Sequence, residues 1–76
     1  MTLKTLREIR LNQGKSQTFM AKKLGYKYAS GYANIEMGRN KPSLEIAKKI
    51  ADILNEDVNV LFFNKNIHNL SKNNSA

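Results

Sequence analysis

The 76-residue sequence contains no cysteine and no tryptophan, one proline and four glycines. Without cysteine there is no disulfide, no thiolate zinc site and no cysteine nucleophile, and a reducing cytosol suits such a chain. No apolar run approaches the roughly 20 residues of a membrane span, and the N-terminus lacks the apolar stretch of a signal peptide. A chain of this length forms one domain at most, with a small core that depends on efficient packing or on a partner chain.

Acidic residues are also scarce, because six Asp and Glu oppose 13 Lys and Arg and leave a net charge of +7. The whole excess lies in the first 54 residues, since the remaining 22 carry two acidic and two basic side chains. A localised excess of positive charge is typical of proteins that bind nucleic acid. A merely soluble basic domain has the same composition, so charge alone leaves both interpretations open.

Apolar residues recur with helical spacing, and no segment shows the alternation of a strand. Ser16 and Ser43 are placed to cap helices, and Gly14, Gly25 and Gly38 are placed to end them. We therefore predict an all-α fold, a compact five-helix bundle with helices over residues 3–13, 17–24, 29–37, 44–54 and from 58 onward. The expected core residues are Leu6, Ile9, Met20, Ala21, Leu24, Tyr32, Ile35, Leu44, Ala47, Ile50, Ala51, Leu54, Val58, Leu61 and Phe62.

The last 13 residues, 64–76, contain five Asn and no capped periodic pattern. We expect residues 1–63 to form the domain and residues 64–76 to form a polar tail. The tail is either flexible or an extension of the last helix, because Phe63, Ile67 and Leu70 fall at helical spacing.

Residues 16–43 have the pattern of a helix-turn-helix motif. Ala21 is small enough for two helices to cross closely, and Gly25 suits the sharp turn between them. Tyr32 and Ile35 would seal the second helix against the first. Each match is weak alone, but together and in this order they predict a motif that places its second helix in the DNA major groove.

At these residues the chain resembles the XRE family, which comprises phage repressor and Cro-type regulators. The resemblance covers residues 3–62 and rests on Arg10, Gly14, Ser16-Gln17, Ala21, Lys23-Leu24-Gly25, Ile35-Glu36, Gly38, Pro42-Ser43-Leu44, Ile50-Ala51, Leu54 and Leu61-Phe62. It implies a lambda-repressor-like bundle that binds double-stranded DNA, usually as a homodimer on a two-fold operator. It also implies a partly buried ion pair between Arg10 and Glu36.

The sequence departs from the common family pattern at three places. Eleven steps separate Gly25 from Glu36, where ten are usual, so the turn or the start of the second helix holds one extra residue. Tyr32 stands where a branched aliphatic residue is usual, and Thr18-Phe19 replaces an acidic pair. The extra residue leaves two assignments of the base-contacting side chains open, one position apart.

The candidate base-contacting residues are Lys27, Tyr28, Ala29, Ser30, Ala33 and Asn34. Asn can bond adenine through two atoms, and Ser can bond several bases. Alternatively, Ser30 caps the helix and Tyr28 packs over the turn, while the two Ala residues either contact thymine methyl groups or are simply small. Gly31 indicates either a close approach to DNA or a helix that begins only after it.

The candidate phosphate-contacting residues are Lys15, Gln17, Arg39, Asn40 and Lys41. The candidate dimer interface consists of Val58, Val60, Phe62, Phe63 and Ile67, because this apolar surface would otherwise be exposed.

No catalytic constellation, cofactor motif or small-molecule site is apparent, and His68 is a lone histidine without a second metal ligand nearby. We therefore expect a non-enzymatic, cytoplasmic, nucleoid-associated regulator of transcription that acts as a repressor, with no metal, no cofactor and no membrane contact. Two alternatives of the same class are a restriction-modification controller and an antitoxin with a protein partner. An alternative of another class is an interaction module that antagonises a repressor without binding DNA.

Overall fold

The computed structural model describes residues 3–63, so the expected tail at residues 64–76 lies outside the described part. The helices are α1 (Lys4–Asn12), α2 (Gln17–Lys23), α3 (Ala29–Glu36) and α4 (Leu44–Leu54), and residues 58–63 are also helical. No strand occurs between residues 3 and 63. The predicted all-α fold is confirmed, and the bounds of the four complete helices agree with the predicted ranges to within one residue.

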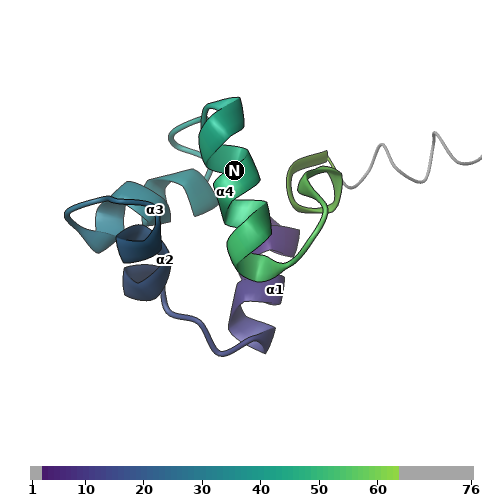
Figure 1. Ribbon diagram of the computed structural model, residues 1–76, viewed down its shortest axis with the longest axis horizontal. Coiled ribbons are helices and arrows are strands. Elements are labelled where there is room, and N and C mark those ends of the chain that lie inside the picture. The colour runs from purple at the N-terminus through teal and green to yellow at the C-terminus, as the bar shows by residue number, and fades with distance from the viewer. Residues whose placement is uncertain (1–2, 64–76) are drawn as a thin grey trace, which may run out of the picture.

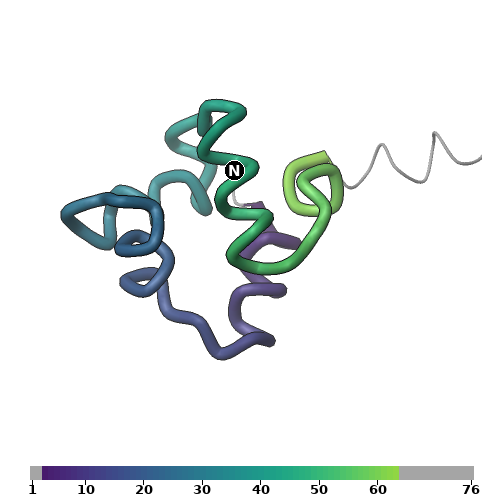
Figure 2. The backbone as a smooth tube through the Cα atoms, in the orientation of Figure 1, coloured from purple at the N-terminus to yellow at the C-terminus, as the bar shows by residue number. Residues whose placement is uncertain are grey.

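The helix-turn-helix pair forms one end of the molecule, where α2 and α3 pack side by side (Figure 1). α1 and α4 occupy the middle, and the helical segment 58–63 lies at the other end (Figure 1). Two hydrogen bonds tie α1 to distant segments: the Leu3 backbone N–H donates to the Glu36 carbonyl at 2.8 Å, and Gln13 Nε2 donates to the Leu54 carbonyl at 2.8 Å. The connection between α2 and α3 projects from the left end of the molecule before the chain returns, and another loop leads to α4 (Figure 2).

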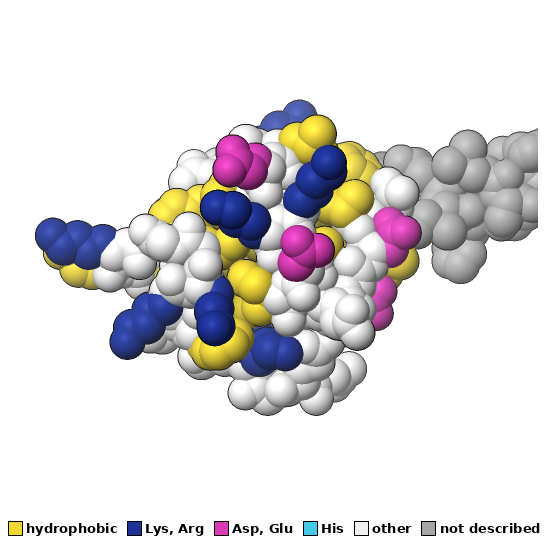
Figure 3. All heavy atoms as spheres, viewed as in Figure 1, with side chains coloured by type: hydrophobic (Ala, Val, Ile, Leu, Met, Phe, Trp, Pro, Cys, Tyr) yellow, Lys and Arg dark blue, Asp and Glu magenta, His cyan; other side chains and the backbone are white. Residues whose placement is uncertain are grey.

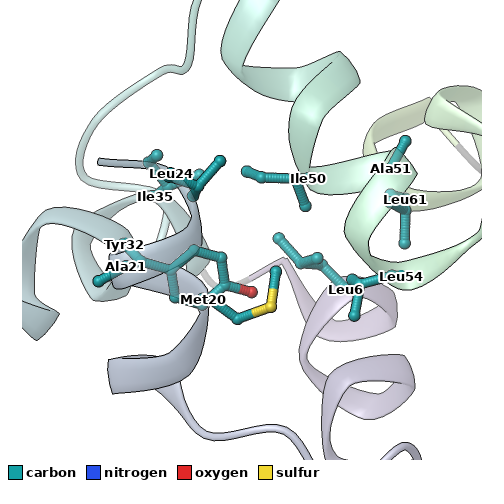
Figure 4. Packing of buried hydrophobic residues seen from close by; sticks show 10 residues of the cluster. All are labelled: Leu6, Met20, Ala21, Leu24, Tyr32, Ile35, Ile50, Ala51, Leu54 and Leu61. Carbon is teal, nitrogen blue, oxygen red and sulfur yellow. The ribbon is translucent and has the colours of Figure 1, made fainter. Parts of the chain in front are cut away.

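The core joins all the helical elements through side chains of ten residues (Figure 4). They are Leu6, Met20, Ala21, Leu24, Tyr32, Ile35, Ile50, Ala51, Leu54 and Leu61. The prediction that Leu44 belongs to the core is wrong, because its side chain is 68% exposed. Leu44 is the first residue of α4 and extends past the edge of the bundle, where no other described helix covers it.

Local capping explains why α2 and α4 begin where they do. Ser16 Oγ accepts a hydrogen bond from the Phe19 backbone N–H at 2.9 Å, and Ser43 Oγ accepts one from Ile46 at 3.2 Å. Each cap satisfies a backbone donor that would otherwise lack a partner within its helix. The turn after α2 requires Gly25, whose φ of +87° is costly for any residue with a side chain.

Gly31 lies inside α3, so the hypothesis that the helix begins only after Gly31 is wrong. A Cβ atom at Gly31 would lie 2.6 Å from Cγ of Tyr26, which packs half-buried against the core. Real Cβ atoms do not approach ring carbons this closely, so the Tyr26 ring needs the space that glycine leaves. This contact between Tyr26 and Gly31 thus packs the turn against α3.

We predict that Gly31→Ala lowers the free energy of unfolding. Overpacking against Tyr26 costs about 1–3 kcal/mol, and the better helix propensity of Ala returns about 1 kcal/mol. A Tyr26→Gly background also removes the Tyr26 Cβ, which would lie 2.9 Å from the new methyl group. There the obstacle is gone, so the same Gly31→Ala change becomes stabilising by up to about 1 kcal/mol. Urea denaturation of the four proteins measures this change of sign, and equal effects in both backgrounds contradict the packing role of Tyr26.

Candidate nucleic-acid interface

A buried ion pair fixes the end of α3 against α1. Arg10 Nε donates to Glu36 Oε2 at 2.7 Å, and Arg10 Nη2 donates to Glu36 Oε1 at 3.0 Å. The third guanidinium nitrogen, Nη1, donates to the Lys15 carbonyl at 2.8 Å in the loop before α2. Both side chains are almost fully buried. The bidentate geometry therefore compensates two charges that have lost their water.

Two further donors bond the same carboxylate. The Tyr32 hydroxyl donates to Glu36 Oε2 at 2.7 Å, and Gln17 Nε2 donates to Glu36 Oε1 at 3.0 Å. The family resemblance implied the ion pair, but the sequence analysis missed these two partners. Tyr32 lies four residues before Glu36 and so on the same helix face, which is the signal that predicts its contact. The Gln17 contact crosses from α2 to α3 and has no comparable signal.

The network determines the charge state of its members. Burial alone raises the pKa of Glu36, but hydrogen bonds from Arg10, Tyr32 and Gln17 outweigh burial and lower that pKa below its usual value. The hydrogen bond to Glu36 raises the pKa of Arg10, and burial with the same carboxylate raises the pKa of Tyr32. Because the folded pKa of Glu36 is depressed, its contribution to stability is complete above its unfolded pKa of about 4.3 and is lost as the pH falls through the folded value.

The outward face of α3 carries four of the predicted base-contacting residues. Ser30 is exposed, and Ala29, Ala33 and Asn34 are half-buried. The side chains of Ser30 and Asn34 make no hydrogen bond with any residue in the range 3–63, so their polar groups are available to a ligand. The alternative that Ser30 caps α3 is wrong, because the capping position belongs to Tyr28.

The other two predicted base-contacting residues precede α3. Tyr28 is 67% exposed, so the alternative that it packs over the turn is wrong. Lys27 is exposed as well, and its Nζ lies 5.8 Å from the centroid of the Tyr28 ring. The structure places this pair directly before the first turn of α3, next to the four outward residues.

The predicted phosphate-contacting residues fall into two groups. Lys15 and Gln17 line a shallow hollow of about 590 Å³ that also reaches Ala29 at the start of α3. Arg39, Asn40 and Lys41 are exposed in the loop between α3 and α4. On the face drawn in Figure 3, Lys and Arg side chains lie over the left part of the molecule and also in the middle and at the top, where acidic side chains lie next to them.

Three of the predicted dimer-interface residues, Val58, Phe62 and Phe63, line an apolar groove of about 490 Å³. The groove also reaches Asn40 and Lys41 in the loop before α4. Leu44 also lines this groove, and the Phe63 side chain is 52% exposed at its edge. Val60 is half-buried outside the groove, and Ile67 lies beyond the described residues.

Within residues 3–63 there is no group of three side chains suited to hold a metal ion. No helix in the same range is long and apolar enough to span a membrane. His68 falls outside the described part of the chain.

A family model described as helix-turn-helix matches residues 6–61, which is most of the chain and includes every element of the interface. The chain belongs to the XRE-type helix-turn-helix family. The bundle is therefore of the lambda-repressor-like type, and this helix-turn-helix protein is a DNA-binding regulator. A comparison with curated proteins gives no match.

We predict that Arg10→Met destabilises this helix-turn-helix domain by about 3–5 kcal/mol, because Glu36 is left buried without its cation. The double variant Arg10→Met/Glu36→Met removes both charges and should be more stable than Arg10→Met alone. Thermal and urea unfolding measure both variants. A double variant less stable than the single one contradicts the view that the stranded charge is the source of the cost.

Proposed function

We propose that the protein is a sequence-specific repressor of transcription that binds double-stranded DNA as a homodimer, in the cytoplasm and on the nucleoid. The observation that carries the proposal is the outward face of α3, where Ser30 and Asn34 present polar groups that no residue in the range 3–63 engages. If the protein used this fold only to bind another protein, unpaired polar side chains on α3 and a large net positive charge would serve no purpose. Repression follows from occupancy, since a dimer bound over a promoter blocks polymerase.

Base contacts come from Lys27, Tyr28, Ala29, Ser30, Ala33 and Asn34 when α3 enters the major groove. Ser30 and Asn34 lie one helical turn apart and share a face, so both can reach base edges at once. Asn34 is the strongest candidate, because its amide matches the paired donor and acceptor of adenine.

Phosphate contacts come from Lys15, Gln17, Arg39, Asn40 and Lys41 on either side of α3. The Gln17 amide donates one N–H to Glu36 and keeps a second N–H for a phosphate oxygen. Glu36 therefore holds Gln17 in position at the edge of the hollow that reaches Ala29. Such contacts set the register of α3 on the duplex and supply affinity without choosing a sequence.

Residues 1–63 form the DNA-binding unit, and the second copy docks at the surface that comprises Val58, Val60, Phe62, Phe63 and Ile67. The apolar groove beside Leu44 supports this choice, since exposed Leu and Phe side chains gain by mutual burial. A second copy also doubles the few base contacts that one α3 can make. Residues 64–76 are a polar tail to this unit.

We predict that selection from a random duplex library at about 0.15 M salt enriches a two-fold site with half-sites about ten base pairs apart. Asn34→Ala should relax one base position in each half-site at a cost of about 1–3 kcal/mol. Arg39→Ala is the control, because loss of a phosphate contact weakens all sequences evenly and lowers the salt slope by about one. A folded protein that enriches no sequence contradicts the proposed function.

We predict that Leu44→Asp and Phe63→Asp weaken self-association without unfolding the domain, because both side chains are exposed. The matched control is Leu11→Asp, since Leu11 is also exposed but lies outside the groove. Sedimentation velocity over a concentration series measures the dimer fraction. Equal weakening by Leu11→Asp, or no weakening by either groove variant, places the dimer interface elsewhere.

A further inference from the structure

The composition of α3 limits which bases it can read. Guanine is recognised mainly through two hydrogen bonds from an Arg or Lys side chain. Helix α3, Ala29–Glu36, contains no Arg, Lys or Gln, although the protein has 13 basic residues in all. Its outward groups are the Asn34 amide, the Ser30 hydroxyl and the methyl groups of Ala29 and Ala33. This set matches adenine edges and thymine methyl groups better than guanine.

Three tyrosines lie near the start of α3, and two have a structural purpose. Tyr32 is buried and bonds Glu36, and Tyr26 covers Gly31. Tyr28 is 67% exposed, and its side chain makes no capping bond at the position where α3 begins. Within residues 3–63, the only partner of its ring is the Lys27 ammonium group at 5.8 Å. The fold therefore does not account for an aromatic ring at the leading end of the recognition helix.

We propose that α3 reads its half-site chiefly as adenine edges and pyrimidine C5-methyl groups, with the Tyr28 ring against one of these methyl groups. This inference rests on the proposed function, because it names the base class of the same site. A C5-methyl group projects into the major groove, where apolar side chains contact it. Lys27 stands beside the ring, with its Nζ 5.8 Å from the ring centroid, and adds a positive charge next to it.

The same methyl group has two sources in DNA, thymine and 5-methylcytosine. Because both bases carry the same methyl group, Tyr28 should also contact 5-methylcytosine where this base occupies the contacted position. The experiment therefore measures the effect of the methyl group on binding separately from the effect of the rest of the base.

The test begins with the half-site enriched by selection, which we expect to be rich in A·T pairs. At each thymine, duplexes carrying thymine, uracil, cytosine or 5-methylcytosine are titrated with wild-type protein, Tyr28→Ala and Tyr28→Phe. At one position the wild type should bind thymine about fourfold more tightly than uracil, which is the effect of burying about one methyl group. Tyr28→Phe should keep this ratio, and Tyr28→Ala should reduce it to about one. Both variants should fold, because the ring is exposed.

The cytosine pair of duplexes identifies the source of the methyl group. A gain at thymine alone assigns the contact to thymine, and an equal gain of 5-methylcytosine over cytosine adds methylated DNA as a ligand. Arg39→Ala is the control, because loss of its proposed phosphate contact should weaken all four duplexes by the same factor.

Several results would overturn the inference while leaving the proposed function intact. These are a half-site rich in guanine contacts, a thymine-to-uracil ratio of one at every position, and a ratio that persists in Tyr28→Ala or disappears in Tyr28→Phe. If no sequence is enriched at all, the proposed function fails and this inference fails with it.

Discussion

The carboxylate of Glu36 is the point on which the arrangement of the interface depends. It accepts four hydrogen bonds, from Nε and Nη2 of Arg10, from the Tyr32 hydroxyl and from Gln17 Nε2. These donors come from α1, α3 and α2, so one buried charge fixes three helices relative to each other. Gln17 stands at a proposed phosphate contact, and α3 carries the proposed base contacts. The same carboxylate therefore fixes the distance between the residues proposed to bind phosphates and those proposed to read bases.

The recognition helix owes its shape to its surroundings. α3 has eight residues, includes Gly31 and has no side-chain cap at Tyr28, so it would not persist alone in water. Buried Tyr32 on one face and Tyr26 over Gly31 on another hold it in place. Because these contacts stabilise α3, the residues on its outward face do not have to stabilise the helix and can be suited to DNA contact instead.

The sequence predicts the helices well because capping serines, glycines and apolar spacing are local signals. Leu44 shows where this reasoning fails: its spacing predicts burial, but burial also needs a neighbouring helix, and none covers the first turn of α4. Gly31 shows a second limit. The close approach of Tyr26 depends on how the turn with the extra residue folds back, which no residue pattern encodes. The cross-helix bond of Gln17 is equally invisible in the sequence.

The division between charged and uncharged contacts in the proposed complex is the reason for proposing two copies of the protein on one site. In this proposal the phosphate-contacting basic residues bind any duplex, so discrimination between sequences rests mainly on the few uncharged groups of α3. Two good base contacts at about 1–3 kcal/mol each give one copy about 2–6 kcal/mol. Specific regulators typically need about 4–10 kcal/mol over non-specific binding. A second copy brings the sum into that range, so the proposed dimer contact at the apolar groove serves sequence choice as well as stability.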